Sequence, residues 1–412
     1  MSEIVVMKFG GTSVGTTERI AAVADRVVNY QKDTGKKVVV VVSAMSGETN
    51  RLVGLCEEVA GGNRYNRREY DQLVASGEQA SSALTSIAIQ KLGTKSQSLL
   101  AHQVGIKTKE ERGKTVIESI DTEVINSLIE NDVVPVLAGF QGVNTQGEFT
   151  TLGRGGSDTS AVAVAAALGC KRCVILTDVD GVYSTSPKIC KNAKKLPFAS
   201  YEEMLEMASS GAKVLQTRSV HLARKFGLEI EVCNSFNNNP GSIITGEYEG
   251  MEDNVVSGIT CLTDQSKITV RSLEDKPGVV AKIFDIVAES GVVVDMIVQN
   301  QGKGGNAAVS FTVPEAEGDI ALEAVQKFIS AEAPELSVEI DKNIAKLAVV
   351  GEGMRAHTGI AAKVFQVLGD EGINIDMITT SEIKISVAFD QKYSELAVRA
   401  LHERFVENAQ KA

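Results

Sequence analysis

The sequence contains no tryptophan, few prolines and few aromatic residues. Of its 412 residues, seven are proline and 5% are aromatic, whereas 43% are hydrophobic and 23% are charged. This balance is typical of a globular chain and excludes a disordered one, and the length predicts two or three domains. No stretch reaches the roughly 18 consecutive apolar residues that a membrane helix requires, so we expect no membrane partner.

Cysteine and histidine are also scarce. Six cysteines are too few for a disulfide scaffold in a chain of this length. The single C-x-x-C, Cys170 and Cys173, lacks the second pair that is typical of a zinc site, so we expect structural thiols and no protein-held metal. The isolated histidines are expected to be structural: His102, His221, His357 and His402. The N-terminus shows neither a basic segment nor a cleavage signal, and we expect a cytoplasmic protein.

The formal net charge of −11 and the pI of about 5.1 argue against a nucleic-acid partner. Anionic small molecules would have to be held by local cations.

The first half of the chain alternates β-branched runs with helical patterns. This alternation predicts an α/β fold with a largely parallel sheet, helices on both faces, and ligands at the carboxyl ends of the strands. The expected strands lie within 36–44, 131–143 and 171–183, and the expected helices span 17–31, 70–91 and 157–168.

After Val232 the chain becomes rich in Asn, Gly and acidic residues, and 234–254 reads as a linker. Beyond it, 276–297 aligns without gaps to 357–378, so that Gly278 matches Gly359 and the sequence Asp-Met-Ile occurs in both. Each copy predicts the βαββαβ plan of a ferredoxin-like domain.

The stretch "VVMKFGGTSVG" places Lys8 at the end of a strand, directly before Gly10 and Gly11. Such a loop allows a large anion to approach backbone N–H groups beside a fixed cation. It is not a P-loop, because the lysine precedes the glycines.

A second glycine-rich loop, "TLGRGGSDTS", surrounds Arg154 and leads into an alanine-rich helix. We expect residues 157–160 to cap this helix, whose N-terminus would attract an anion. A tight turn with a solvated arginine is the alternative interpretation. Two such loops at strand ends favour a phosphoryl-transfer site, in which Lys8 faces the transferred group. Asp158 would orient Lys8 or hold Mg²⁺ through water.

The stretch "TDVDGVY" ends a strand with Asp178 and Asp180, which are placed to bracket a nucleotide base and ribose, with Tyr183 nearby. Lys213, in "SGAKVL", offers a further cation.

The ordered set "MKFGGTSV", "VVSAMSGETNRL", "ASGEQ", "GFQGV", "TLGRGGSDTSA", "TDVDGVY", "GAKVL" and "TSEIKISV" resembles the aspartate kinases of the amino-acid-kinase superfamily, from about residue 4 to 405. The repeated copies resemble ACT domains, which bind regulatory amino acids. The resemblance implies a three-layer sandwich with a mainly parallel sheet, followed by two ferredoxin-like ACT domains. The implied boundaries are 1–247 for the catalytic domain (lobes of about 1–150 and 151–240), 248–265 for a linker and strand, 266–340 and 341–412.

The resemblance further implies ATP-dependent phosphorylation of L-aspartate to 4-phospho-L-aspartate with Mg²⁺, the first step towards lysine, threonine and methionine. Lys8, Arg154 and Asp158 are the implied catalytic residues. The implied ATP contacts are Lys8, Phe9, Gly10, Gly11, Thr177, Asp178, Tyr183 and Lys213, and the implied aspartate contacts are Thr49, Glu78, Arg154 and Ser157. Arg154 suits the α-carboxylate and Glu78 the α-ammonium.

For regulation, the resemblance implies threonine, lysine or both as effectors, and a homodimer or higher oligomer in which unlike copies from two subunits pair. The implied effector residues are Asp275, Gly278, Val294, Asp295, Gln299, Gly359, Asn374 and Asp376. Met251 is a candidate internal start for a separate regulatory chain.

Two departures from the family pattern stand out. Lys188 replaces an arginine after the nucleotide strand, and Ala307 and Ala308 replace a Thr-Asp pair in the first copy. The alternatives are a kinase for glutamate, acetylglutamate, carbamate or UMP, and a non-catalytic amino-acid sensor. Glu78 together with Arg154 argues against carbamate and UMP, and retention of Lys8, Arg154 and Asp158 argues against a mere sensor.

Overall fold

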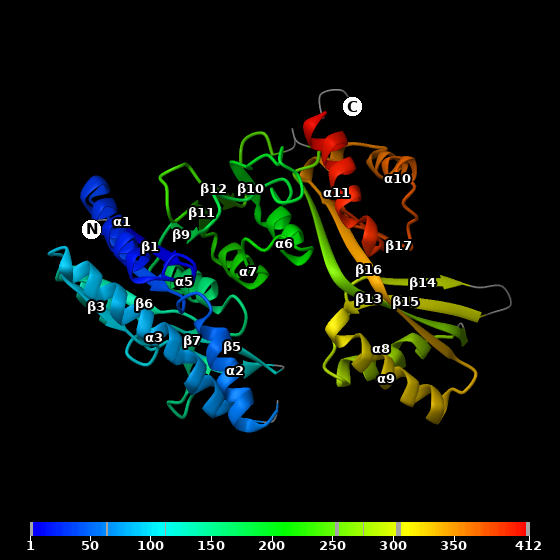
Figure 1. Cartoon of the computed structure of the whole chain (residues 1–412), viewed down its shortest axis with the longest axis horizontal. Helices are drawn as coiled ribbons and strands as arrows, with labels where there is room; N and C mark the ends of the chain where they lie inside the picture. The colour runs from blue at the N-terminus through cyan, green and yellow to red at the C-terminus, as the bar shows by residue number, and fades with distance from the viewer. Residues whose placement is uncertain are drawn as a thin grey trace. The chain divides into compact units, whose positions relative to one another are not determined.

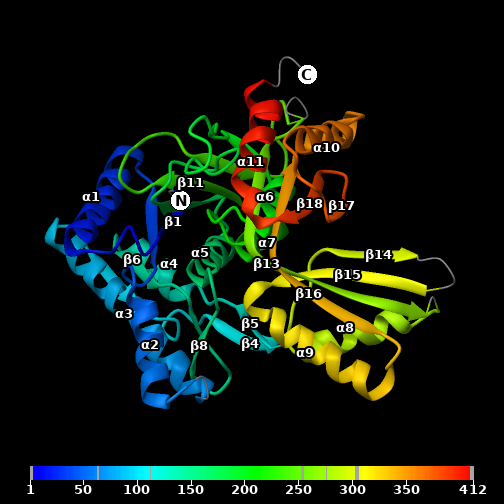
Figure 2. The same cartoon turned by 45° about the vertical axis from the view of Figure 1, so that its right-hand side comes forward.

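The computed structural model describes residues 3–62, 65–111, 113–251, 255–274, 276–301 and 306–408 (Figures 1 and 2). The chain divides into two compact units. The first unit comprises Met1–Val182, Lys195–Ala208 and Lys213–Glu249, and the second comprises Tyr183–Lys194, Ser209–Ala212 and Gly250–Ala412.

An eight-stranded sheet forms the centre of the first unit, in the order β10-β12-β11-β9-β1-β2-β6-β3. In the described residues its ladders are parallel except for β11 with β12. The mainly parallel sheet that the sequence predicts is therefore confirmed. The strands are β1 (Ile4–Phe9), β2 (Lys37–Val42), β3 (Ser96–Leu99), β6 (Val134–Ala138), β9 (Arg172–Thr177), β10 (Phe198–Ser200), β11 (Glu229–Asn234) and β12 (Ser242–Thr245).

Helices cover both faces of this sheet (Figure 2). α1 (Thr17–Thr34) and α3 (Arg67–Lys91) pack on each other over one face, whereas α5 (Gly156–Ala167) and α7 (Thr217–Phe226) pack together over the other. Because side chains alternate along a strand, Met7 and Phe9 of β1 enter the apolar core beneath α1, and Lys8 points to the side of α5. The remaining helices are α2 (Glu48–Ala60), α4 (Glu123–Glu130) and α6 (Tyr201–Ser209).

The first unit also contains a small four-stranded sheet in the order β5-β4-β7-β8. It contains β4 (Lys107–Glu111), β5 (Lys114–Ser119), β7 (Gln141–Val143) and β8 (Phe149–Thr151). The run 131–143, predicted as one strand, is split into β6 and β7. Phe140 has a φ of 67°, and a Cβ at Gly139 would lie 2.9 Å from the carbonyl oxygen of Val42, so the chain turns here beside β2.

The interpretation of 234–254 as a linker is wrong for its centre. β12 occupies Ser242–Thr245 and pairs with both β10 and β11, so the asparagine-rich stretch is only the turn before an internal strand.

The second unit contains a six-stranded sheet in the order β14-β15-β13-β16-β18-β17. Its strands are β13 (Gly258–Glu274), β14 (Ile297–Gln301), β15 (Asn306–Pro314), β16 (Ser337–Val350), β17 (Met377–Thr380) and β18 (Lys384–Asp390). Its helices are α8 (Val279–Glu289), α9 (Glu315–Glu332), α10 (Ile360–Asp370) and α11 (Ser394–His402), with short helical turns at Glu352–Ala356, Gln391–Tyr393 and Glu403–Glu407.

Both repeated copies are present, and they share β13 and β16. The first module consists of the end of β13, α8, β14, β15, α9 and the start of β16, which is the predicted βαββαβ order. The second module runs from the end of β16 through α10, β17, β18 and α11. Its fourth strand is Gly258–Leu262, the start of β13, which pairs with Lys346–Val350. The first module is thus inserted into the second.

None of the helices in the described ranges combines the length and the apolar character that crossing a bilayer requires.

Candidate active site

A cavity of about 350 Å³ opens in the first unit where β1, β2 and β6 end and α5 begins. It brings together every residue that was expected to be catalytic or to contact aspartate: Lys8, Thr49, Glu78, Arg154, Ser157 and Asp158. Gly11, Ser43–Gly47 and Phe140 complete much of its wall. These residues are far apart in the sequence, so the fold alone creates the cluster.

Lys8 and Asp158 form an ion pair across the floor of this cavity. The Nζ of Lys8 lies 2.6 Å from Oδ1 of Asp158, and each side chain is only 10% exposed. Oδ1 accepts no well-aligned hydrogen bond from the described residues, so the contact is mainly electrostatic. Lys8 is therefore held by charge attraction at the carboxyl end of β1 and remains available to a second anion.

The loop after β1 approaches the loop after β2 closely. A Cβ at Gly11 would lie 2.9 Å from the carbonyl oxygen of Ala44, so a side chain there would push the two loops apart. Gly10 donates its N–H to the carbonyl of Leu176 at 3.0 Å, which ties the loop to β9. Phe9 has its side chain in the core, so only its backbone can contact a ligand at this sheet edge.

The second glycine loop enters α5 without a side-chain cap. Gly155 is the N-cap residue in a left-handed conformation, with φ of 70°, and no side chain accepts from the first turn. The expectation that residues 157–160 cap the helix is therefore wrong. Thr159 and Ser160 instead donate their hydroxyls back to the carbonyls of Gly155 and Gly156, at 3.3 and 3.0 Å. The helix begins at Gly156, before all four residues that were expected to cap it.

Arg154 lies on the rim of the cavity and is exposed. Within the described part of the chain it forms no hydrogen bond or ion pair. Its guanidinium is therefore available to a ligand.

Glu78 projects from α3 into the cavity wall and is only 3% exposed. Its Oε1 accepts the N–H of Ala44 at 3.0 Å, whereas its buried Oε2 has no hydrogen-bond partner among the described residues. Burial raises the pKa of Glu78 to about 7, although the Ala44 hydrogen bond and nearby Lys8 act in the opposite direction. This buried carboxylate oxygen is therefore open to a hydrogen-bond donor on a ligand.

The expected nucleotide residues lie at the neighbouring strand ends. Thr177 ends β9, which pairs with β1, and Asp178 follows it; the Thr177 hydroxyl donates to Asp178 at 3.2 Å. Asp180 instead accepts hydrogen bonds from Asn234 and Asn237, at 2.6 and 3.0 Å, and these lower its pKa. Asp180 thus braces the loop.

Lys213 is exposed, three residues before Gln216. A Cβ at Gly155 would collide with the Gln216 side chain, so the segment of Lys213 runs beside the second glycine loop. Tyr183, also expected at the nucleotide, belongs to the second unit.

Sequence reasoning missed two charged supports of the second glycine loop, the half-buried Arg218 and the buried Asp71. Arg218 of α7 donates to the carbonyls of Leu152 and Thr115, at 2.9 and 2.7 Å, and burial lowers its pKa. Asp71 of α3 accepts the hydroxyl of Thr151 at 2.7 Å, and burial raises its pKa. Neither residue belongs to a recognisable motif, so only the unusual charge within a helical pattern could have indicated them.

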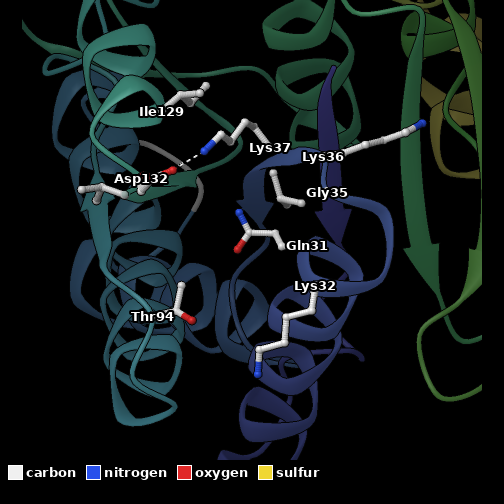
Figure 3. Close-up of a pocket in the computed structure, with 10 residues that line it drawn as sticks. Gln31, Lys32, Gly35, Lys36, Lys37, Thr94, Ile129 and Asp132 are labelled. Carbon is white, nitrogen blue, oxygen red and sulfur yellow. Dashed lines mark hydrogen bonds and ion pairs between the residues drawn. The ribbon is translucent and has the colours of Figure 1, made fainter. Parts of the chain in front are cut away.

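A second hollow, of about 280 Å³, lies at the opposite edge of the main sheet, where β2 begins (Figure 3). Lys37 and Asp132 form an ion pair across it, and their side chains are 29% and 78% exposed. No residue that the sequence singled out lines this hollow. The pair therefore offers a comparison for Lys8 and Asp158.

The cysteines of the C-x-x-C are free thiols. Burial raises the pKa of Cys170 to about 11, and that of Cys173 also rises. Both thiols are accordingly unreactive near neutral pH.

In the repeated modules, the two expected glycine turns are present. Gly278 and Gly359 are left-handed N-cap residues of α8 and α10, with φ of 90° and 82°. Val294 precedes β14, Gln299 lies within it, and Asn374 donates to Asp376 at 3.5 Å. Asp275 falls outside the described residues.

The expected effector aspartates are engaged in crossed ion pairs. Asp295, of the first module, pairs with Lys346, which lies in the first strand of the second module and is 3% exposed. Asp376, of the second module, lies 3.7 Å from Lys267, in the first strand of the first module. Each module therefore supplies a cation to the Asp-Met-Ile turn of the other.

Ala307, one of the two departures in the first copy, is buried in the core beneath α8 and α9. A threonine hydroxyl there would require a hydrogen-bond partner within this apolar core.

Comparison with known proteins agrees with this geometry. Residues 3–234 match the model of the amino acid kinase family, and residues 268–328 and 347–405 match an ACT domain. The fold and the site thus define a phosphotransferase of the amino acid kinase family with ACT domains.

Among the relatives, the chain is 47% identical to an aspartokinase of Helicobacter pylori (strain J99 / ATCC 700824) over 403 residues, covering 97% of this chain and 98% of the relative. It is also 47% identical to an aspartate kinase of Pseudomonas fluorescens, covering 98% and 97%. The chain belongs to the aspartokinase family, and the resemblance noted in the sequence is confirmed.

Among solved structures, E. coli aspartokinase III in complex with aspartate and ADP matches with a TM-score of 0.82 at 26% identity, covering 97% of this chain and 99% of that one. The same enzyme in complex with lysine and aspartate matches with a TM-score of 0.76, covering 98% and 100%. The fold predicted from the sequence is therefore confirmed in both its catalytic and its regulatory parts.

Proposed function

We propose that the chain transfers the γ-phosphoryl group of ATP to the side-chain carboxylate of L-aspartate, giving ADP and 4-phospho-L-aspartate. The observation that carries this proposal is the cavity that places a buried, donor-free Glu78 oxygen and an available Arg154 around the Lys8–Asp158 pair. The complex of E. coli aspartokinase III with aspartate and ADP supports the pairing of an amino acid and a nucleotide.

Two charges of opposite sign would orient the amino acid. Arg154 would hold the α-carboxylate bidentately, and the free Oε2 of Glu78 would accept the α-ammonium. Thr49 and Ser157, which line the same cavity, would supply further hydrogen bonds. The side-chain carboxylate then points towards Lys8. It is ionised at neutral pH, so the attack requires no general base.

Lys8 would neutralise charge on the transferred phosphoryl group, which is the main requirement of such chemistry. The backbone of Phe9, Gly10 and Gly11 would meet the phosphates, and Thr177, Asp178 and Lys213 would contact the nucleotide.

Mg²⁺ fits this cavity through Asp158, whose Oδ1 is buried and lacks a well-aligned donor. Carboxylate oxygen, water and phosphate oxygens are the ligands that Mg²⁺ prefers. When bound, the ion would supply charge neutralisation to the phosphates. Asp158 would hold it through water and keep Lys8 in place.

A hydroxamate assay with ATP, Mg²⁺ and one amino acid at a time tests the proposal. We expect acyl hydroxamate from L-aspartate and little from glutamate or acetylglutamate. Arg154→Ala should abolish the product at low aspartate, whereas Lys37→Ala, at the opposite edge of the sheet, should leave it unchanged. Product from glutamate alone would identify another amino-acid kinase, and no product from any acid would indicate a non-catalytic sensor.

We further propose that lysine, threonine or both inhibit the enzyme through the two modules, and that a homodimer is the smallest regulated unit. The complex of E. coli aspartokinase III with lysine supports an amino acid as effector. The turns at Gly278 and Gly359 would offer the N-termini of α8 and α10 to its α-carboxylate.

A further inference from the structure

The chain leaves the nucleotide loop and immediately becomes part of the regulatory unit. Thr177 ends β9, and Asp178–Val182 remain in the first unit. Tyr183–Lys194 belong to the second unit, and the chain returns to the first unit at Lys195. We call Tyr183–Lys194 the excursion segment.

The base of the excursion segment is a narrow pair of chain stretches held together by hydrogen bonds. Leu196 donates its N–H to the carbonyl of Val182 at 2.8 Å, and Ser184 donates to the carbonyl of Lys194 at 2.8 Å. Ser242 of β12 braces this base, because its hydroxyl accepts the N–H of Val182 at 2.8 Å. Ser184 is therefore joined to the nucleotide loop by a short, hydrogen-bonded stretch of chain.

Within the second unit, Ser184 is held by a chain of three side chains, which we call the clasp; Ser184 and His402 are buried, whereas the Glu407 side chain is 29% exposed. The Ser184 hydroxyl lies 2.9 Å from Nε2 of His402, and Nδ1 of His402 lies 3.0 Å from Oε1 of Glu407. The Ser184 oxygen also accepts the N–H of Lys194 at 2.9 Å. With its hydrogen on Nδ1, His402 satisfies both neighbours.

The clasp has the residue types of a hydrolytic triad but no access for a substrate. Ser184 is 1% exposed and His402 is 0% exposed. A nucleophilic role is therefore excluded, and a buried hydrogen bond such as that between Ser184 and His402 serves to fix geometry.

Three further residues of the excursion segment pack into the core of the second module. Cys190 is buried in the same apolar cluster as Val364 of α10 and Leu401 of α11, with Ile189 and Ala193 packed against it. Two polar contacts reinforce this attachment: Lys194 Nζ donates to the carbonyl of Val406 at 2.6 Å, and Asn192 donates to Glu407 at 2.9 Å.

We infer that Ser184, His402 and Glu407 are positioning residues for the nucleotide, and that the clasp passes the state of the second module to the nucleotide loop. The inference rests on the proposed roles of Thr177 and Asp178 in ATP binding. It adds a route by which an event in the regulatory unit reaches the phosphoryl donor rather than the aspartate pocket, because the excursion segment joins the chain directly after the nucleotide loop.

The test compares three variants of the full chain. His402→Ala removes both contacts of the imidazole, His402→Gln retains a donor and acceptor near Ser184, and Ser184→Ala removes the other partner. We expect His402→Ala to raise KM for ATP about fivefold or more, the lower range of coupling between linked sites. KM for aspartate should change less than twofold. Ser184→Ala should act in the same direction, and His402→Gln should recover most of the loss.

The matched control is Val364→Ala, which loosens the same apolar core without touching the clasp. Thermal unfolding would show that His402→Ala and Val364→Ala are destabilised to a similar degree. Equal increases of KM for ATP in both variants would show that the clasp only stabilises the module and would overturn the inference. An unchanged KM for ATP in His402→Ala would overturn it as well.

Binding of ADP, measured by titration calorimetry, separates this inference from the proposed activity. Weaker ADP binding in His402→Ala and Ser184→Ala, but not in Val364→Ala, supports the clasp even if the hydroxamate assay identifies a different acceptor. Normal ADP binding in a folded Ser184→Ala variant rejects the clasp while leaving the proposed reaction intact. Should His402→Ala fail to fold, the smaller change Ser184→Ala decides the question alone.

Discussion

The Nζ of Lys8 and Oδ1 of Asp158 lie 2.6 Å apart in a cavity where both side chains are 10% exposed, although the two residues are 150 positions apart in the sequence. A buried cation held in this way is preorganised for a second anion, because its position does not depend on the ligand.

Lys8→Ala is expected to lower kcat about 10²-fold or more, since a preorganised charge contact to the transition state is lost. KM for aspartate should change little. Lys37→Ala removes the lysine of the exposed pair with Asp132 (Figure 3) and should retain full kcat. Steady-state kinetics of both variants measure this, and a Lys8→Ala enzyme within threefold of the parent would contradict the role of Lys8.

Arg154→Ala should raise KM for aspartate far more than KM for ATP. The α-carboxylate would be left without its partner in a partly dry cavity, a loss of roughly 2–5 kcal/mol. Arg172→Ala is a suitable control, because Arg172 pairs with Glu229 and Glu231 away from the cavity. Equal increases of both KM values in Arg154→Ala would assign the arginine to the nucleotide instead.

Glu78 predicts a pH dependence of aspartate binding. Its pKa is raised from 4.5 to about 7, so the free enzyme loses the carboxylate charge as the pH falls through 7. KM for aspartate should therefore rise as the pH is lowered from 8 to 6, and Glu78→Gln should bind aspartate weakly at every pH. A flat profile in the parent enzyme between these values would refute the assignment.

The raised pKa of Glu78 also makes the folding stability depend on pH, and stability falls as the pH rises. Because the folded pKa lies above the unfolded value, the stabilising contribution is complete below pH 4.5 and is lost as the pH rises through 7. Glu78→Gln should thus gain stability relative to the parent as the pH increases, by roughly 2–3 kcal/mol above pH 8. Thermal unfolding without ligand at pH 5 and pH 8 measures the difference, and an equal effect at both values would exclude it.

Asp295→Ala should be more destabilising than Asp376→Ala. Removing Asp295 leaves Lys346, which is 3% exposed, as a buried charge without that partner, whereas Lys267 is 20% exposed and lies 3.7 Å from Asp376. Leaving a buried charge without its partner costs up to about 3–5 kcal/mol, less here because the Asp295 side chain is itself 49% exposed, and a partly exposed pair contributes about 1 kcal/mol or less. Thermal unfolding tests the order, and Lys346→Met combined with Asp295→Ala should recover much of the loss.

Both aspartate variants should also relieve inhibition by lysine or threonine while retaining the uninhibited kcat. If an effector weakens the binding of aspartate, linkage requires that aspartate weaken the binding of that effector by the same factor. Binding titrations of each amino acid with and without the other measure this reciprocity. If neither amino acid at millimolar concentration changes activity or thermal stability, the modules are structural.

Local patterns were sufficient for much of the fold and of the site. Lys8 before two glycines, Arg154 in a glycine loop, and the repeated turns at Gly278 and Gly359 each carry a short-range signal that the structure retains. Burial of the β-branched runs also follows from composition alone.

Features that depend on distant packing were not predictable. The strand at Ser242–Thr245 follows an asparagine-rich turn, and it forms because it pairs with both β10 and β11. His402 is isolated in the sequence, and its partner Ser184 is 218 residues away. The crossed pairs of Lys346 and Lys267 likewise require the two modules to share their long strands.

The excursion segment also bears on where a regulatory chain can begin. A chain that started at Met251 would include Gly258–Leu262 and hence all four strands of the second module. It would lack Ser184 and Cys190, so His402 would lose its hydroxyl partner and the apolar cluster around α10 would be opened to water. Such a chain would expose a partly apolar surface at one end of its second module, and its solubility would depend on what covers that surface.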